Sequence, residues 1–302
     1  MKKLLSPLKN KIMQYLPKND LHGFEYTVTE LVGMYENSTL ASKWHGTIIS
    51  DDIIQYKTSD TIFILGSGPS INEITSSEWE HIRQHNSIGF NYWFAHEFVP
   101  TFYAFQGGND EMLKILQDKY SEYHNIPFII RGSAFAKGEF NFDDERINLL
   151  KNNPVFYINE YPIAGRCSID PYLLFRYMEA LGFMTYSHIS KFIPKWRGTL
   201  GLLIMLAYQM GYKRIVLCGI DMQKPDHFWD YEPYLSVKQK YSLPDKGTAN
   251  LMTFTDESVS ANTVPRYVYC LRDWMYEKNG VELFIMNTKT VLHPELDVYK
   301  YR

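Results

Sequence analysis

The stretch Thr61-Ile-Phe-Ile-Leu-Gly-Ser-Gly-Pro-Ser-Ile71 decides the fold. Its apolar and β-branched first half predicts a strand that is buried on both faces, as in a parallel sheet. Gly66 and Gly68 follow, so the backbone can turn tightly and approach a ligand closely. A helix is expected to begin near Ile71, with its free N–H groups directed at whatever lies over the turn. The stretch therefore predicts an anion site, with a nucleotide phosphate as the favoured anion. A strand-to-helix turn without a ligand is the alternative.

Length and composition bound the class of protein. The chain has 302 residues, of which 45% are hydrophobic, and this suffices for one large α/β domain with an appendage. The net charge of −3 argues against a broad nucleic-acid-binding surface, so no nucleic-acid partner is expected. Cys167, Cys218 and Cys270 lie far apart and form no Cys-x-x-Cys motif. This cysteine usage predicts a reduced, cytoplasmic protein.

The N-terminal part of the chain has a different pattern. Apolar residues recur at helical spacing between Leu4 and Leu16, and lysines accompany them over residues 1–18. A basic amphipathic helix of this kind could lie on an anionic membrane surface, peripheral to the inner membrane, while packing on the protein body is the alternative. Helical periodicity continues further along the chain. We therefore interpret residues 1–58 as a helical extension and residues 59–302 as the α/β domain.

Strands and helices alternate over the rest of the chain. Strands are expected at 61–65, 87–90, 102–105, 127–130, 154–158, 214–218 and 281–286. Helices are expected at 76–84, 111–119, 200–210 and 265–278. The alternation predicts an α/β fold with a doubly wound, mostly parallel sheet. In such a sheet ligands lie outside the carboxyl ends of the strands. Polar side chains follow several predicted strand ends: Ser67, Asn91, Gln106 and Asp221.

Several segments together carry a resemblance to a known family. They are Gly66-Ser-Gly-Pro-Ser70, Asn91, Arg197-Gly-Thr-Leu-Gly201 and Gly211-Tyr-Lys-Arg-Ile-Val-Leu-Cys-Gly-Ile-Asp221. In order and spacing they are similar to bacterial lipooligosaccharide sialyltransferases, over roughly residues 60–290. The resemblance implies a Rossmann-like nucleotide domain of the GT-A variant type with a small lid, which we place at about 223–263. It also implies an inverting, metal-independent glycosyltransferase that transfers a nonulosonic acid from a CMP-sugar to a surface glycan or glycolipid, without a further cofactor.

The same resemblance implies a donor site. Its residues are Gly66, Ser67, Gly68, Pro69, Ser70, Asn91, Gln106, Arg197, Thr199, Gly201, Gly219 and Asp221. Ser67 stands where the family more often has asparagine, and Leu200 replaces a serine. The Arg197 guanidinium could hold the donor carboxylate or phosphate as a bidentate fork, and an ion pair at the sheet edge is the equal alternative.

The predicted catalytic base comes from Asp226-His-Phe-Trp-Asp-Tyr231, which resembles a His-Tyr-x-x-His segment of the family. His227 matches the first histidine, and Tyr231 stands in place of the second. An imidazole with an unperturbed pKa near ~6.5 suits the deprotonation of an acceptor hydroxyl at neutral pH. Asp230 is the second candidate base and Asp256 the third. A structural hydrogen bond is the alternative role for His227.

Other aromatic and histidine side chains leave two interpretations open. Phe228, Trp229 and Tyr231 could close over cytosine or the sugar, although such a cluster more often packs in a core. His188 could shape the acceptor side, but a structural role is favoured, and His293-Pro294 is interpreted as a turn after the last strand.

Two further functions stay open. A related family with the Gly-x-Gly-Pro-Ser opening implies a pterin diphosphokinase-like enzyme, which would need Mg²⁺ and a carboxylate cluster. The missing second histidine favours a nucleotide-sugar-binding protein without catalysis. The sequence has no Asp-x-Asp pair, which fits a donor with a single phosphate and no metal. The donor sugar, the acceptor, the linkage and the oligomeric state, a homo-oligomer included, are left open.

Overall fold

A parallel β-sheet forms the centre of the molecule. The computed structural model describes residues 37, 46–105, 110–131, 151–163, 170–196, 198–223, 225–245 and 263–301. Within them, an eight-stranded sheet has the order β1-β6-β5-β4-β3-β2-β9-β10, and every neighbouring pair is parallel. Its strands are β1 (Thr47–Ile48), β2 (Thr61–Leu65), β3 (Asn86–Phe90), β4 (Phe102–Phe105), β5 (Phe128–Arg131), β6 (Val155–Ile158), β9 (Arg214–Cys218) and β10 (Glu282–Ile285). The predicted α/β class is confirmed, and the arrangement is consistent with a Rossmann-like fold.

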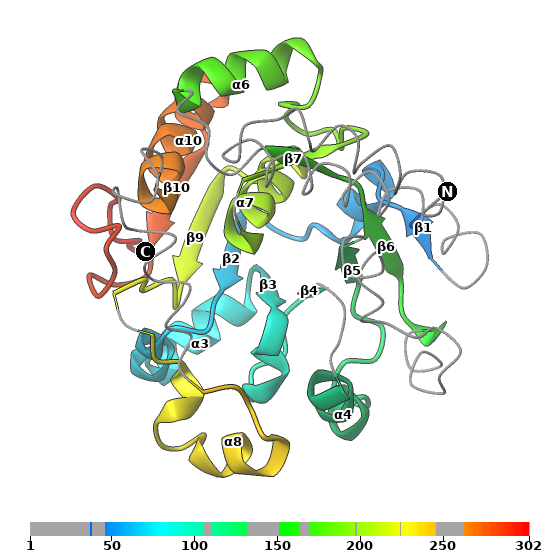
Figure 1. Ribbon diagram of the computed structural model, residues 1–302, viewed down its shortest axis with the longest axis vertical. Coiled ribbons are helices and arrows are strands. Elements are labelled where there is room, and N and C mark those ends of the chain that lie inside the picture. The colour runs from blue at the N-terminus through cyan, green and yellow to red at the C-terminus, as the bar shows by residue number, and fades with distance from the viewer. Residues whose placement is uncertain are drawn as a thin grey trace, which may run out of the picture.

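Helices cover both faces of this sheet (Figure 1). One face packs against α6 (Pro171–Ala180), α7 (Thr199–Gln209) and α10 (Val264–Asn279). The other face packs against α3 (Ser76–Arg83), α4 (Asp110–Lys119) and α8 (Leu235–Tyr241). Short 3₁₀ helices are η1 (Asp51–Tyr56), η2 (Pro69–Glu73), η3 (Asn91–Ala95) and η5 (Phe228–Asp230). A second, two-stranded parallel sheet consists of β7 (Glu160–Ile163) and β8 (Ile193–Trp196).

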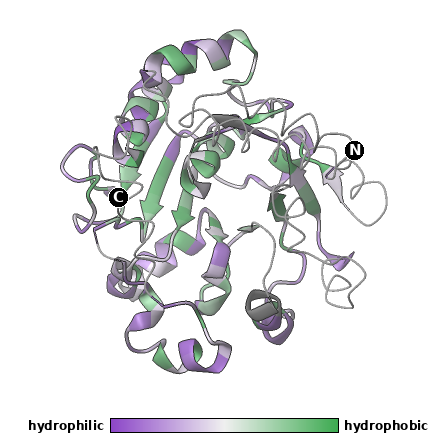
Figure 2. Ribbon diagram, viewed as in Figure 1, coloured by the Kyte–Doolittle hydropathy of each residue, from purple (hydrophilic) through white to green (hydrophobic). Residues whose placement is uncertain are grey.

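The sequence of β2 follows from its central position. Ile62 and Ile64 point into the core beside α7, whereas Phe63 and Leu65 point into the opposite core beside α3 and η5. All four side chains are at most 1% exposed. A strand with cover on both faces has no solvent-facing side, so its sequence is apolar throughout instead of alternating. Figure 2 shows the same pattern, with β2 and most of β9 coloured as hydrophobic.

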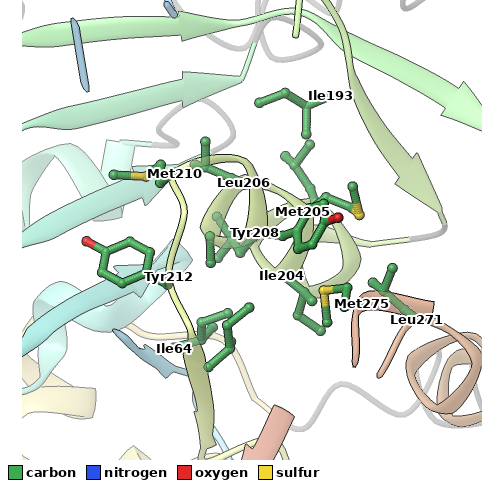
Figure 3. Close-up of a cluster of buried hydrophobic side chains, with 14 of the residues drawn as sticks. Ile64, Ile193, Ile204, Met205, Leu206, Tyr208, Met210, Tyr212, Leu271 and Met275 are labelled. Atoms are coloured by element: carbon green, nitrogen blue, oxygen red, sulfur yellow. The ribbon is translucent and has the colours of Figure 1, made fainter. Parts of the chain in front are cut away.

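Helix α7 is also apolar on all sides because it is buried on all sides. Its residues from Gly201 to Gln209 are buried. Figure 3 shows its side chains between Ile64 of β2, Ile193 of β8 and Met275 of α10. A helix that is hydrophobic all round belongs in the interior of a domain. This packing fixes the position of the α7 N-terminus relative to the sheet.

The predicted elements from residue 61 onward agree with the observed ones to within one residue at each end, wherever the sequence predicted an element. One exception is the helix expected near Ile71, and that prediction is wrong. The 3₁₀ helix η2 occupies Pro69–Glu73, and the α-helix begins only at Ser76, after Thr75 and Glu78 form a capping box. The sequence analysis also missed β7, β8, α6 and α8.

Residues 46–58 differ from the predicted helical extension. Thr47–Ile48 forms the edge strand β1, which pairs with β6 of the main sheet, and η1 follows it. This segment is therefore part of the α/β domain. Most of the remaining extension, including the membrane contact predicted for 1–18, lies outside the described residues. None of the helices in the described part of the chain combines the length and the apolar character needed to cross a membrane.

Of the predicted lid at 223–263, the structure describes residues 223, 225–245 and 263. Its aromatic residues Phe228 and Trp229 are at most 1% exposed and belong to the core on the α3 side of the sheet. The packing interpretation of these two side chains is therefore confirmed. The helix α8 packs beside them and beside α4. Residues 246–262, with the candidate base Asp256, lie outside the described part.

Candidate functional site

The strand order reverses at β2. From β2 the sheet extends through β3, β4, β5 and β6 on one side and through β9 and β10 on the other. Open α/β sheets bind ligands outside the carboxyl ends of the strands at such a reversal. The segments that leave β2 and β9 there are Gly66–Ser70 and Gly219–Asp221. We call this part of the molecule, together with His227, the switch-point edge.

The turn after β2 uses its amides within the protein. The Gly68 N–H donates to the Gly219 carbonyl at 2.8 Å, and the Ser70 N–H donates to Asp221 Oδ2 at 2.9 Å. The prediction that these N–H groups point freely at a ligand is therefore wrong, because the β9 segment accepts both. The short η2 helix that follows is a second reason, since it offers no α-helical N-terminus to an anion.

The glycines of this turn allow two backbone segments to touch. A Cβ on Gly66 would lie 2.6 Å from the Gly219 carbonyl oxygen, and one on Gly68 would lie 2.5 Å from Asp221 Oδ2. Gly219 has a left-handed φ of 64°, and a Cβ there would lie 2.4 Å from Ile71 Cγ1. Real Cβ atoms do not approach so closely, so the glycines are needed for contact between the β2 and β9 segments.

Asp221 links the same two segments. Its Oδ1 accepts a hydrogen bond from Ser70 Oγ at 2.5 Å, and its Oδ2 accepts the one from the Ser70 amide. Burial raises the pKa of the Asp221 carboxyl above its ordinary value, while the hydrogen bonds from Ser70 act in the opposite direction. Asp221 is only 9% exposed. These contacts assign it a structural role at the base of the switch-point edge.

His227 lies against the turn from the other side. Its Nδ1 is 3.1 Å from Ser67 Oγ, and the Phe228 N–H donates to the Ser67 carbonyl at 2.9 Å. The imidazole stacks on Trp229 with ring centroids 4.3 Å apart. Burial lowers the pKa of His227 below 6.5, with nearby Asp230 acting in the opposite direction. The imidazole is therefore neutral at pH 7, and Ser67 contacts Nδ1, which leaves Nε2 as the atom that could take a proton.

Asp230 fixes the backbone of His227. Its Oδ2 accepts the His227 N–H at 2.8 Å, and its Oδ1 lies 2.7 Å from Lys238 Nζ. Its side chain is 7% exposed. Because both carboxylate oxygens have partners, the geometry favours a capping role over the predicted role as a base. Tyr231 donates its hydroxyl to Asp226 Oδ2 at 2.8 Å and is 42% exposed.

The start of α7 lies at the same edge of the sheet. The helix runs back toward the amino end of β9, so its N-terminus, at Thr199, is placed at the carboxyl ends of the strands. Its N-cap is Gly198, with an extended φ of −164° and no capping hydrogen bond from a side chain. A Cβ on Gly198 would meet no atom within 4 Å. The positive end of the α7 helix dipole therefore lies at the switch-point edge.

The remaining predicted site residues fall into two groups. Thr199 is half-buried and Gly201 is buried in the first turn of α7, and Pro69 begins η2. Asn91 follows β3 with a left-handed φ of 55°, and its carbonyl accepts a hydrogen bond from the Tyr103 hydroxyl. The other group, Gln106 and Arg197, lies outside the described residues.

Two residues at this edge were missed by the sequence analysis. Gly198 was not among the predicted site residues, although a glycine directly before an apolar helical segment is a known N-cap signal. Met222, just after β9, has a left-handed φ of 54°. That conformation costs a bulky side chain about 1–3 kcal/mol and is found preferentially at functional sites. No local pattern in the sequence reveals it.

His188, which lies outside this edge, has a structural contact. His188 Nδ1 lies 2.7 Å from Asp51 Oδ2, and the Ile189 N–H donates to Asp51 Oδ1 at 2.7 Å. This pairing favours the structural role. Over the described ranges, no three His, Cys, Asp or Glu side chains are grouped closely enough to hold a metal ion.

The chain was compared with family models and with curated proteins. No family model matches it, and no curated protein matches it either. The resemblance to sialyltransferases therefore rests on the segments quoted above and stays a prediction.

Proposed function

We propose that this protein is an inverting glycosyltransferase that transfers a nonulosonic acid from a CMP-sugar to a glycan acceptor. The observation that carries the proposal is the position of His227, a neutral imidazole held at the point where the strand order reverses. Nucleotides bind at this point in doubly wound sheets. A neutral imidazole there is suited to remove a proton from an acceptor hydroxyl.

The reaction requires one bond to form and one to break. The acceptor oxygen would attack the anomeric carbon of the donor from the face opposite to the phosphate, which inverts that centre. Its proton would pass to His227 Nε2, and CMP would leave with the electrons of the broken C–O bond. The positive N-terminus of α7, in front of Gly198, is suited to stabilise the negative charge on the departing phosphate. The donor phosphate would thus lie at α7 and not in the turn after β2.

The test measures release of CMP from CMP-N-acetylneuraminate by the full chain, with EDTA present. Wild-type protein is expected to release CMP, and His227→Asn is expected to lower turnover by about 100-fold or more. His188→Asn is the matched control, because His188 is exposed and, within the described part of the chain, forms its ion pair with Asp51; its turnover should be unchanged. Absence of CMP release, or equal turnover in wild type and His227→Asn, contradicts the proposal.

One observation favours a second candidate, a nucleotide-sugar-binding protein without catalysis. Tyr231 stands where the related family has its second histidine, and its hydroxyl is engaged by Asp226. Under this alternative, CMP raises the melting temperature of the protein by mass action without any CMP release from the donor. The shift would be the same in His227→Asn. Mg²⁺-dependent consumption of ATP would instead indicate the pterin diphosphokinase-like activity.

A further inference from the structure

A pocket of about 790 Å³ lies away from the switch-point edge. It is bordered by the end of α3, by the amino ends of β9 and β10, and by the C-terminal segment 297–300. Arg214 and Glu282 are the first residues of β9 and β10, so the pocket opens toward the edge of the sheet opposite to Gly66–Ser70. Its volume falls within the ~300–1,000 Å³ that is typical of small-molecule sites.

Arg214 is held in a fixed orientation at this pocket. Its Nε donates to Thr61 Oγ1 at 2.8 Å, and Thr61 is fully buried. No described carboxylate forms an ion pair with the guanidinium, although Arg214 is exposed. The two terminal nitrogens therefore remain available for a planar anion, and a guanidinium fork matches a carboxylate in particular.

The pocket also contains three other charged side chains. Lys300 adds a second cation, while Glu282 and Asp297 add two carboxylates. Among the described residues none of these three side chains forms an ion pair. A ligand with a second negative charge would be repelled by the carboxylates, whereas hydroxyl groups would be accepted by them as hydrogen-bond donors. Arg214 and Lys300 balance these two carboxylates, of which Glu282 lies in register with Arg214 on the neighbouring strand. The pocket can therefore take one carboxylate at the Arg214 guanidinium, with hydroxyls at Glu282 and Asp297.

Aromatic rings supply an apolar wall. Tyr299 and Phe284 line the pocket, and their ring centroids are 5.6 Å apart. The ring centroids of His81 and Tyr299 are 5.8 Å apart. Half-exposed rings of this kind offer flat surfaces to the C–H faces of a sugar. The lining therefore combines an arginine fork, acceptors for hydroxyls and an aromatic wall.

We propose that this pocket binds an acidic carbohydrate, a polyhydroxylated ring that carries one carboxylate. The carboxylate lies on the Arg214 fork, the hydroxyls donate to Glu282 and Asp297, and the ring lies against Tyr299. The proposal does not depend on the glycosyltransferase reaction at the switch-point edge.

Isothermal titration calorimetry of the full chain with glucuronate tests this site, with glucose as the probe that lacks a carboxylate. Glucuronate is expected to bind saturably and glucose to bind at least about tenfold more weakly. Arg214→Gln is expected to weaken glucuronate binding by about tenfold or more, and Lys300→Gln by about threefold. Arg83→Gln is the matched control, because Arg83 is an exposed arginine of α3 that does not line the pocket, and it should bind as wild type does.

Several results would overturn the proposal. They are no glucuronate binding, equal binding of glucose, and unchanged affinity in Lys300→Gln, whose exposed side chain can be replaced without disturbing the core. Saturating CMP should leave the glucuronate affinity unchanged. Competition by CMP would indicate that glucuronate binds at the switch-point edge, and this would contradict a separate site at Arg214.

Discussion

The turn after β2 and the start of α7 both contain a glycine at the carboxyl edge of the sheet, and the two glycines have opposite surroundings. A Cβ on Gly68 would lie 2.5 Å from Asp221 Oδ2, whereas a Cβ on Gly198 would meet no atom within 4 Å. The first glycine permits contact between two segments of the protein, whereas the position of the second has room for a Cβ at the start of a helix. A glycine-rich turn can therefore bind an anion only where its amides lack partners within the protein.

The largest stability effect is expected from Gly68→Ala, which should lower the free energy of unfolding by about 2–3 kcal/mol. The new methyl group would overlap both Asp221 Oδ2 and the Gly219 carbonyl. Gly198→Ala is the matched control and should cost less than about 1 kcal/mol. Urea unfolding of both variants measures the difference. Equal losses of unfolding free energy in the two variants would contradict the difference in packing around the two glycines.

Asp221→Asn should destabilise the protein by about 2 kcal/mol, because an amide cannot accept both hydrogen bonds from Ser70 and leaves one buried donor unpaired. A double-mutant cycle with Ser70→Ala measures the coupling, expected to be about 1 kcal/mol or more. Additive losses would show that the two side chains act independently, and the structural role of Asp221 would then fail.

The pH dependence of stability at His96 provides a test of whether the side of the sheet beneath the turn after β2 belongs to the hydrophobic core. It is 3% exposed, stacks on Trp93, and burial lowers its pKa to about 3. Since an unfolded histidine has a pKa of about 6.5, protonation favours the unfolded chain. The contribution of neutral His96 to the free energy of unfolding is therefore fully present above pH 6.5. It decreases as the pH falls, by about 2 kcal/mol near pH 5.

Urea midpoints at neutral pH and near pH 5 measure this loss. His96→Asn should be less stable at neutral pH, because packing is lost, but its midpoint should depend less on pH. His188→Asn, a change at an exposed position, should keep the wild-type pH dependence. If the urea midpoint of His96→Asn depended on pH as steeply as that of wild type, the loss of stability at low pH would come from other titrating side chains.

The smallest stability effect is expected from Ser67→Ala, within about 1 kcal/mol, because one hydrogen bond at a half-buried side chain is removed. Turnover should fall several-fold, since Nδ1 of His227 loses its anchor. In wild type, turnover should decrease with falling pH around a midpoint below 6.5, because only the neutral imidazole can accept a proton. A midpoint above 6.5 would contradict this role of His227.

The sequence predicts regular structure well where a buried element is long enough to show a pattern. The apolar runs of β2, β9 and α7 are examples, and their bounds agree to within one residue. The two-residue strand β1 has no such pattern. The contacts of the site escape prediction for another reason. Ser70 and Asp221 are 151 residues apart in the chain, so no local pattern shows that one accepts the hydrogen bonds of the other.

The position of His227 illustrates what a resemblance adds. The imidazole lies beside Ser67, from which it is separated by 160 residues, and the prediction that the two lie close together came from a resemblance in the order of segments and not from any local pattern. The same resemblance placed the phosphate in the turn after β2, where the amides of Gly68 and Ser70 already have partners. Motif order thus grouped residues that the structure places at one edge of the sheet, and hydrogen bonding shows which amides of the turn after β2 are already engaged.

The most direct test of this account is a crystal structure of the protein with CMP bound. We expect the nucleotide at the carboxyl ends of β2 and β9, with its phosphate in front of Gly198 and Thr199 at the start of α7. A phosphate held by the amides of Gly66–Ser70, or CMP bound in the pocket at Arg214, would contradict the account.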